Sequence, residues 1–168
     1  MTTDFALWPL FSQMILLAVM FMGAMAGSTG GGLKASRMLV LIKSGSAETM
    51  RVLRPRGIYS VKINKKTQPE ETVKAIHNHF LVTIAILFVA TLHISFDPQA
   101  DFITAFTASL TCLSNVGPGL GTLVGPCGSF AALSGFSKIV LSFVMLIGRL
   151  EIFPILLLFS PRTWSKRY

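Results

Sequence analysis

The residues of this sequence whose spacing could support chemistry are glycines rather than clusters of reactive side chains. One glycine-rich stretch is Asn115-Val116-Gly117-Pro118-Gly119, and a second contains the triplet Gly30-Gly31-Gly32. Glycine allows backbone conformations that other residues resist, so such a stretch can present carbonyl oxygens that replace the hydration shell of a cation. Taken alone, the Xaa-Val-Gly-Xaa-Gly pattern is a weak signal, and it more often marks a surface turn. The elements that flank it therefore decide between the two interpretations.

Side-chain catalysis finds little support in the sequence. The seven acidic residues are scattered, and no nucleophile lies at a useful spacing from a base. The stretch from Gly27 to Lys34 resembles a phosphate-binding loop, but Gly32 is followed by Leu33 where that loop requires lysine, and no strand precedes it. We therefore expect no enzyme activity and no covalently bound cofactor.

The two cysteines, Cys112 and Cys127, are too few for a disulfide framework, and neither sits in a metal-binding pattern. They could pair if both faced one extracytoplasmic loop, and the sequence leaves this open.

The composition indicates an integral membrane protein. Of the 168 residues, 52% are hydrophobic and only 13% are charged, about half of the 25% that is usual in soluble domains. The segments 5–33, 75–96 and 102–137 contain no charged residue, and each is long enough to hold a membrane span or most of one.

The basic residues indicate the orientation of the chain. Fifteen lysines and arginines oppose seven acids, which gives a net charge of +8. Ten of them lie between Lys34 and Lys74, and three more lie near the C-terminus. Because positive residues beside apolar spans accumulate in the cytoplasm, we expect the segments 34–74 and 161–168 to be cytoplasmic. Few aromatic residues lie among the basic ones, so we do not expect nucleic-acid binding.

The segment 1–33 is predicted to be a membrane helix that runs from outside to inside and ends in a glycine-rich intramembrane loop. Its helix should begin near Leu10, after Trp8-Pro9. The glycines from Gly23 onward cost roughly 1 kcal/mol each relative to alanine in a helix, which predicts a break at membrane depth. The segment 34–74, with Pro55, Gly57 and Pro69 as breakers, is then expected to be a solvated connection.

The segment 75–160 is predicted to contain a span, a short helix, a glycine-rich loop and a second span. A helix start is expected at Pro69-Glu70-Glu71, ahead of the first span. The short helix, over 99–113, has about 15 residues and a length of roughly 22 Å, which is too short to cross about 30 Å of hydrocarbon. The second span, over 136–159, contains Arg149 and Glu151, and such intramembrane charges usually face a pore or a polar partner.

These elements predict an all-α membrane fold with one span, pore helix, filter loop, span repeat of a potassium-channel-like pore. A broken helix is expected before it. In such a repeat we expect Asn115 to Gly117 to be extended, with their carbonyl oxygens directed at one axis. A secondary transporter with broken helices is the main alternative and makes no such demand.

The chain resembles the Trk/Ktr/HKT superfamily of potassium transporters, and most closely its bacterial TrkH branch. The motifs that carry this resemblance cover almost the whole chain: Asp4-Phe-Ala-Leu-Trp-Pro9, Ala26-Gly-Ser-Thr-Gly-Gly-Gly-Leu-Lys34, Leu113-Ser-Asn-Val-Gly-Pro-Gly-Leu-Gly121 and Gly148-Arg-Leu-Glu-Ile-Phe-Pro154. The resemblance implies that the segment 75–160 is the fourth pore repeat and that the first helix is the second helix of the third repeat.

The resemblance also implies roles for individual residues. The carbonyl oxygens of four of them would bind the transported K⁺ in the selectivity filter: Ser114, Asn115, Val116 and Gly117. A gate beneath the filter would consist of a loop and a basic residue of the last helix: Gly27, Ser28, Thr29, Gly30, Gly31, Gly32 and Arg149.

The partners that the resemblance implies are the lipid bilayer, the remaining repeats of the same transporter, a second copy in a homodimer, and a cytosolic nucleotide-binding regulatory subunit similar to TrkA. The location implied is the bacterial inner membrane, with the C-terminus in the cytoplasm. Because one filter segment of four is present, we expect that the chain does not transport K⁺ alone.

Overall fold

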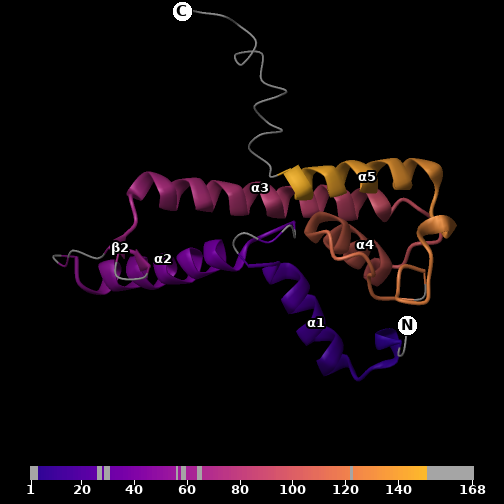
Figure 1. The fold of residues 1–168 in the computed structure, drawn as a ribbon, viewed down its shortest axis with the longest axis horizontal. Coiled ribbons are helices and arrows are strands. Elements are labelled where there is room, and N and C mark those ends of the chain that lie inside the picture. Colours follow the sequence, from indigo (N-terminus) through magenta and orange to yellow (C-terminus); the bar gives the residue numbers. More distant parts are fainter. Residues whose placement is uncertain are drawn as a thin grey trace, which may run out of the picture.

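The computed structural model describes residues 4–25, 28, 31–55, 57, 60–63, 66–121 and 123–150. In these residues the fold is helical apart from one two-stranded hairpin (Figure 1). The elements in chain order are the 3-10 helix η1 (Phe5–Leu7), α1 (Leu10–Met22), α2 (Ala35–Leu53), β1 (Lys62–Ile63), β2 (Lys66–Thr67), α3 (Glu70–Ile94), α4 (Phe102–Ser114), the 3-10 helix η2 (Phe130–Ala132) and α5 (Gly135–Leu150).

Helix α1 ends where the glycine content predicts a break. Its last residue is Met22, and Gly23 adopts a φ of 65°, a left-handed conformation that suits glycine. A Cβ at Gly23 would collide with the carbonyl oxygen of Leu33, so the backbones of these two residues are in close contact. The N–H of Ala35 also donates to the carbonyl of Ala24 at 3.1 Å. The described residues just after α1 and just before α2 therefore lie next to each other.

Helix α2 lies within the segment 34–74, which the sequence predicts to be a solvated connection. It has 19 residues, Ala35–Leu53. Its one internal glycine, Gly45, costs only about 1 kcal/mol. The helix packs against α3, where Val40 is buried and the Arg37 Nη1 group donates to His79 Nε2 at 2.9 Å. Tertiary contacts with α3 thus stabilise a helix whose polar composition suggests a loop.

Among the described residues between α2 and α3 lies a small hairpin. Strands β1 and β2 pair in antiparallel fashion, with Lys62 opposite Thr67 and Ile63 opposite Lys66. The Lys43 ammonium group donates to the carbonyl of Lys62 at 2.9 Å, which ties the hairpin to α2.

Helix α3 begins directly after Pro69, as the sequence predicts, with Glu70 and Glu71 in its first turn. At 25 residues it is, within the described ranges, the one helix that is long and apolar enough to cross a membrane. Helix α5 covers the first part of the predicted last span and ends at Leu150. The rest of that span, with Glu151, and the basic tail lie outside the described residues.

Helix α4 is the short helix predicted before the glycine-rich loop, and it lies at the centre of the structure. It packs against α1, α3 and α5 (Figure 1). Every residue from Thr107 to Ser114 is buried. The apolar partners come from α3 and α5, with Leu87, Ala90 and Ile94 on the first and Leu141 and Val144 on the second. Because this helix is enclosed, the loop that follows it is held in a defined place.

Asp97 links the turn after α3 to the start of α5. Its Oδ2 accepts the Ser134 N–H at 2.7 Å and the Ser137 hydroxyl at 3.1 Å, while its Oδ1 accepts the Gln99 N–H at 3.4 Å. These donors favour the carboxylate and, led by the Ser134 N–H, hold the pKa of Asp97 below its ordinary value. The side chain therefore fastens the two long helices together next to α4.

Candidate functional site

The glycine-rich loop leaves α4 through a left-handed residue. Asn115 caps the helix with φ 54° and ψ 40°, and within the described residues it is the one non-glycine position with a positive φ. Asparagine tolerates this conformation better than most residues. Gly117 follows with φ 113°. The backbone therefore turns sharply twice within three residues.

Three successive N–H groups at this turn are bound by α4. The Asn115 N–H donates to the Cys112 carbonyl at 3.3 Å, and the Val116 N–H donates to the Thr111 carbonyl at 3.1 Å. The Gly117 N–H donates to the Thr111 hydroxyl at 3.0 Å. The three peptide groups that join residues 114 to 117 thus all direct their donors toward the helix.

The carbonyl oxygens of the same peptide groups point the other way. The described residues contain no cis peptide bond, and in a trans peptide the C=O and N–H point in opposite directions. The oxygens of Ser114, Asn115 and Val116 therefore face away from the bonds to α4. Within the described residues, no hydrogen bond is donated to the oxygens of Asn115 and Val116. Two adjacent carbonyl oxygens are therefore available to bind a cation.

The expectation of an extended backbone over Asn115–Gly117 is wrong at Asn115. In an extended strand, successive peptide groups alternate in direction, so their oxygens cannot all face one side. The left-handed turn at Asn115 removes this alternation.

The second half of the loop is also anchored on α4. The Thr107 hydroxyl accepts the Leu120 N–H at 3.1 Å and lies 2.9 Å from the carbonyl oxygen of the same residue. The Gly119 N–H donates to the Val124 carbonyl at 2.7 Å. Thr107 and Thr111 are four residues apart, so they lie on one face of the helix. The loop therefore runs back along α4, held by two buried threonines.

The described part of the predicted gate lies against the predicted filter. A Cβ at Gly31 would meet the Asn115 side chain, the Gly148 carbonyl oxygen at 2.8 Å and the Leu113 carbonyl oxygen at 2.9 Å. A Cβ at Gly32, where φ is 73°, would meet the Ser114 hydroxyl at 3.1 Å. Ser28 is exposed, whereas Gly27, Thr29 and Gly30 lie outside the described residues. Glycines thus allow the backbone of 31–32 to touch the end of α4.

Arg149 shares a cavity with Asn115. This cavity, of about 430 Å³, is lined by Asn115 and by Ser142, Met145, Leu146 and Arg149 of α5. The Asn115 amide group donates to the Met145 carbonyl at 3.3 Å, which holds the loop against the same helix. A guanidinium group on the wall of this cavity opposes the accumulation of cations in it.

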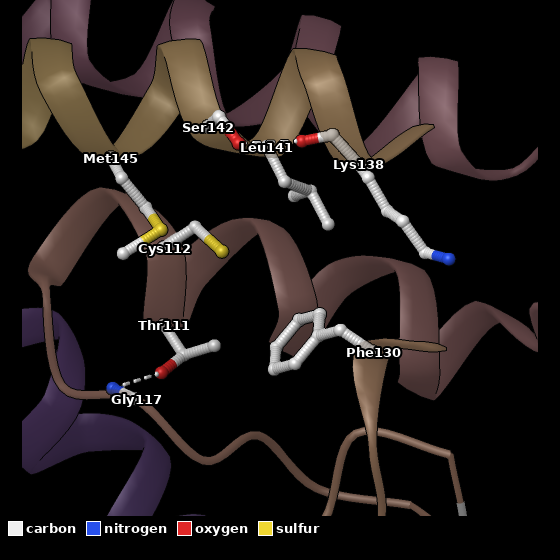
Figure 2. Close-up of a pocket in the computed structure, with 8 residues that line it drawn as sticks. All are labelled: Thr111, Cys112, Gly117, Phe130, Lys138, Leu141, Ser142 and Met145. Carbon is white, nitrogen blue, oxygen red and sulfur yellow. Dashed lines mark hydrogen bonds between the residues drawn. The ribbon is translucent and has the colours of Figure 1, made fainter. Parts of the chain in front are cut away.

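A second cavity lies on the side of the loop that faces α5. It has a volume of about 290 Å³, and Thr111, Gly117, Leu141 and Met145 are among the residues that line it. Figure 2 shows the Gly117 N–H bonded to the Thr111 hydroxyl at the edge of this space, with Cys112 and Met145 nearby. The peptide group between Val116 and Gly117 is therefore positioned by a hydrogen bond next to empty volume.

Sequence reasoning gave no role to Thr107 or Thr111, and it named Gly148 only as the first residue of the motif 148–154. A signal existed for the threonines, because two hydroxyl residues at a spacing of four in an apolar helix before a glycine-rich loop are placed to bond that loop. No comparable signal marks Gly148, whose role depends on contact with a residue 35 positions earlier. The two cysteines are both free, with Cys112 buried and Cys127 exposed.

A short buried helix that ends in a loop of outward-directed carbonyl oxygens, beside a membrane-length helix, is typical of a cation-transport protein. Comparison with known families agrees with this class. The model of the TrkH family, described as "Cation transport protein", matches residues 1–168, and the chain belongs to this family.

Individual relatives support this assignment. The Trk system potassium uptake protein TrkH of Salmonella typhimurium is 39% identical over 166 residues, which cover 98% of this chain and 34% of that protein. The Trk system potassium uptake protein TrkG of Escherichia coli strain K12 is 32% identical over 165 residues. The crystal structure of the potassium transporter TrkH from Vibrio parahaemolyticus matches with a TM-score of 0.86 and 38% identity, over 98% of this chain and 34% of that one. The chain thus spans about a third of the length of its relatives.

Proposed function

We propose that the chain is one part of a potassium transporter and supplies one segment of its selectivity filter. The observation that supports this most directly is the set of hydrogen bonds that tie the Asn115, Val116 and Gly117 N–H groups to α4. They leave the carbonyl oxygens of Ser114, Asn115 and Val116 facing away from the helix. The relatives named above are potassium uptake proteins.

The chemistry of K⁺ accounts for this arrangement. Carbonyl oxygens replace the water molecules around the ion, and several converging segments are needed to surround it. The negative end of the α4 dipole, at its C-terminus, also favours a cation near Ser114. Because one segment contributes only a few oxygens, the chain alone is not expected to transport K⁺. The other segments would come from the remaining repeats of the same transporter.

The gate is part of the same proposal. The loop 27–32 would obstruct the pore beneath the filter, and its glycines would let it move without side-chain obstruction. Arg149 would add a positive barrier there. The contacts of Gly31 and Gly32 with the end of α4, and the cavity shared by Asn115 and Arg149, support this role.

The orientation follows from charge. The segments 1–33 and 75–160 would lie in the bacterial inner membrane, with 34–74 and 161–168 in the cytoplasm, where most of the lysines and arginines are found. A homodimer and a cytosolic nucleotide-binding subunit similar to TrkA are the proposed partners. Helix α2 and the hairpin would face that subunit.

Growth of a bacterium that lacks its own potassium uptake systems tests the function. Three proteins are expressed at low external K⁺: this chain, the Vibrio parahaemolyticus TrkH, and a chimera in which this chain replaces the matched third of that TrkH. Growth with the chimera and with the TrkH, but not with the chain alone, is the expected result. Growth with the TrkH but not with the chimera would contradict the proposed function, and growth with the chain alone would contradict the need for further filter segments.

A further inference from the structure

Thr111 holds two successive peptide groups of the loop. Its backbone carbonyl accepts the Val116 N–H at 3.1 Å, and its hydroxyl accepts the Gly117 N–H at 3.0 Å. The residue itself is 0% exposed. The second bond comes from the side chain alone, so it depends on the residue type at position 111.

The Thr111 hydroxyl determines where the Val116 carbonyl oxygen points. The N–H of Gly117 and the C=O of Val116 belong to one peptide group, so turning one toward α4 turns the other away from it. The next residue, Pro118, has no N–H. The bond to Thr111 is therefore the last one that α4 can make before the proline.

Packing does not hold this peptide group in place. A Cβ at Gly117 would meet no described atom within 4 Å. The cavity of about 290 Å³ borders the same residue (Figure 2). Glycine also adopts positive and negative φ values about equally readily. Without the hydroxyl, the peptide group could rotate, withdrawing an oxygen from the ion and presenting an N–H in its place.

We propose that Thr111 is a positioning residue that fixes the Val116 carbonyl oxygen and thereby sets the preference of the filter for K⁺ over Na⁺. This inference rests on the proposed role of Asn115–Gly117 as a filter segment. Thr111 does not touch the ion. It acts through the peptide group that it orients, so a variant should change which ion passes more than it changes folding.

The test compares ion uptake by the chimera with Thr111→Val, Thr111→Ser and the unchanged residue. Valine keeps the shape of threonine but cannot accept the Gly117 N–H, whereas serine keeps the hydroxyl. We expect Thr111→Val to lower the ratio of K⁺ to Na⁺ uptake by about fivefold to tenfold, the scale of one hydrogen bond. Thr111→Ser should restore a ratio within about twofold of the unchanged chimera.

A matched control is Thr83→Val in α3. Thr83 is also buried, and its hydroxyl donates to the His79 carbonyl of the same helix at 2.8 Å. It lies far from the loop along the chain. This variant should leave the ratio unchanged. If Thr111→Val does not reach the membrane, Thr111→Ala takes its place, because alanine also lacks the hydroxyl and cannot clash with the residues around it.

The outcomes separate the two proposals. If the unchanged chimera takes up no K⁺, the proposed function fails. If the chimera prefers K⁺ and Thr111→Val or its alanine substitute keeps the same preference, the function stands and the role of Thr111 is wrong. An equal loss of preference in Thr111→Ser and Thr111→Val would also overturn it, because the hydroxyl would then not be the cause.

Discussion

Gly148 of α5 lies so close to Leu113 of α4 that a Cβ at position 148 would overlap the Leu113 carbonyl oxygen. It would also come within 2.9 Å of the Asn115 side-chain amide. The carbonyl oxygen of Gly148 in turn limits the space at Gly31. One glycine therefore lets the end of α4, helix α5 and the backbone near the predicted gate meet at a single point.

Replacement of Gly148 by alanine should destabilise this meeting point. The added methyl group must displace backbone rather than a flexible side chain, and overpacking of this kind costs about 1–3 kcal/mol. We expect Gly148→Ala to lower both the thermal unfolding temperature of the purified chimera in detergent and its K⁺ uptake.

Gly45→Ala is the matched control for that experiment. Gly45 lies inside α2, is exposed, and a Cβ there meets no described atom within 4 Å. Alanine should therefore stabilise the helix by about 0.5–1 kcal/mol. Equal unfolding temperatures for the two variants would show that the contact with Leu113 is not tight.

Replacement of Arg149 by glutamine should increase K⁺ uptake by the chimera. The guanidinium group lies on the wall of the cavity that it shares with Asn115, and removing a positive charge beside a cation path lowers the electrostatic barrier. We expect uptake to rise several-fold, with little change in expression. Arg51→Gln in α2 is the control, because Arg51 is exposed, pairs with Glu48 at 2.8 Å and lines neither cavity beside the loop. A fall in uptake with Arg149→Gln, together with a lower unfolding temperature, would assign Arg149 a structural role.

Much of the fold is predictable from local patterns. The break after Met22, the start of α3 after Pro69 and the short helix before the glycine-rich loop all follow from glycine, proline and hydrophobic run length. Helix α2 does not, because the polar and basic composition of its segment suggests a solvated connection. Its stability comes from contacts with α3, such as Arg37 with His79, that join residues 42 positions apart.

The candidate site is predictable in its location but not in its geometry. The glycine spacing identifies Asn115 and Gly117, yet it suggests an extended strand where the structure has a left-handed turn. The direction of the carbonyl oxygens depends on hydrogen bonds to Thr111. The spacing of Thr107 and Thr111 indicates contact with the loop, but it does not say which N–H groups are bound. Gly27, Thr29 and Gly30 lie outside the described residues, and the roles assigned to all the filter and gate residues stay predictions.

Asp97 should make stability depend on pH in the acidic range. Its pKa is held below the ordinary value, chiefly by the Ser134 N–H, so the native state binds this proton less tightly than the unfolded chain does. The contribution of Asp97 is therefore fully present above the unfolded pKa of about 4 and is lost as the pH falls through the lower native value.

The unfolding temperature of the purified chimera, measured between about pH 3 and pH 8, tests this dependence. Asp97→Asn should lower the unfolding temperature at neutral pH and reduce its fall in acid. Asp101→Asn is the control, since Asp101 is exposed and makes no capping hydrogen bond to α4. If Asp97→Asn matches the unchanged chimera at every pH, the link between the turn after α3 and the start of α5 contributes nothing.

The two cysteines should differ in their reaction with a membrane-impermeant maleimide. Cys127 is exposed in the segment between α4 and α5, whereas Cys112 is buried within α4. In intact spheroplasts that express the chimera, we expect labelling that Cys127→Ser removes and Cys112→Ser leaves unchanged, because a maleimide requires an accessible thiol.

The same experiment reports the orientation of the chain. A cysteine introduced by Ser46→Cys on the exposed side of α2, in the Cys127→Ser background, should react only after the membrane is permeabilised. Reaction of that cysteine in intact spheroplasts would contradict the proposed orientation, since Cys127 and α2 would then lie on the same side of the membrane.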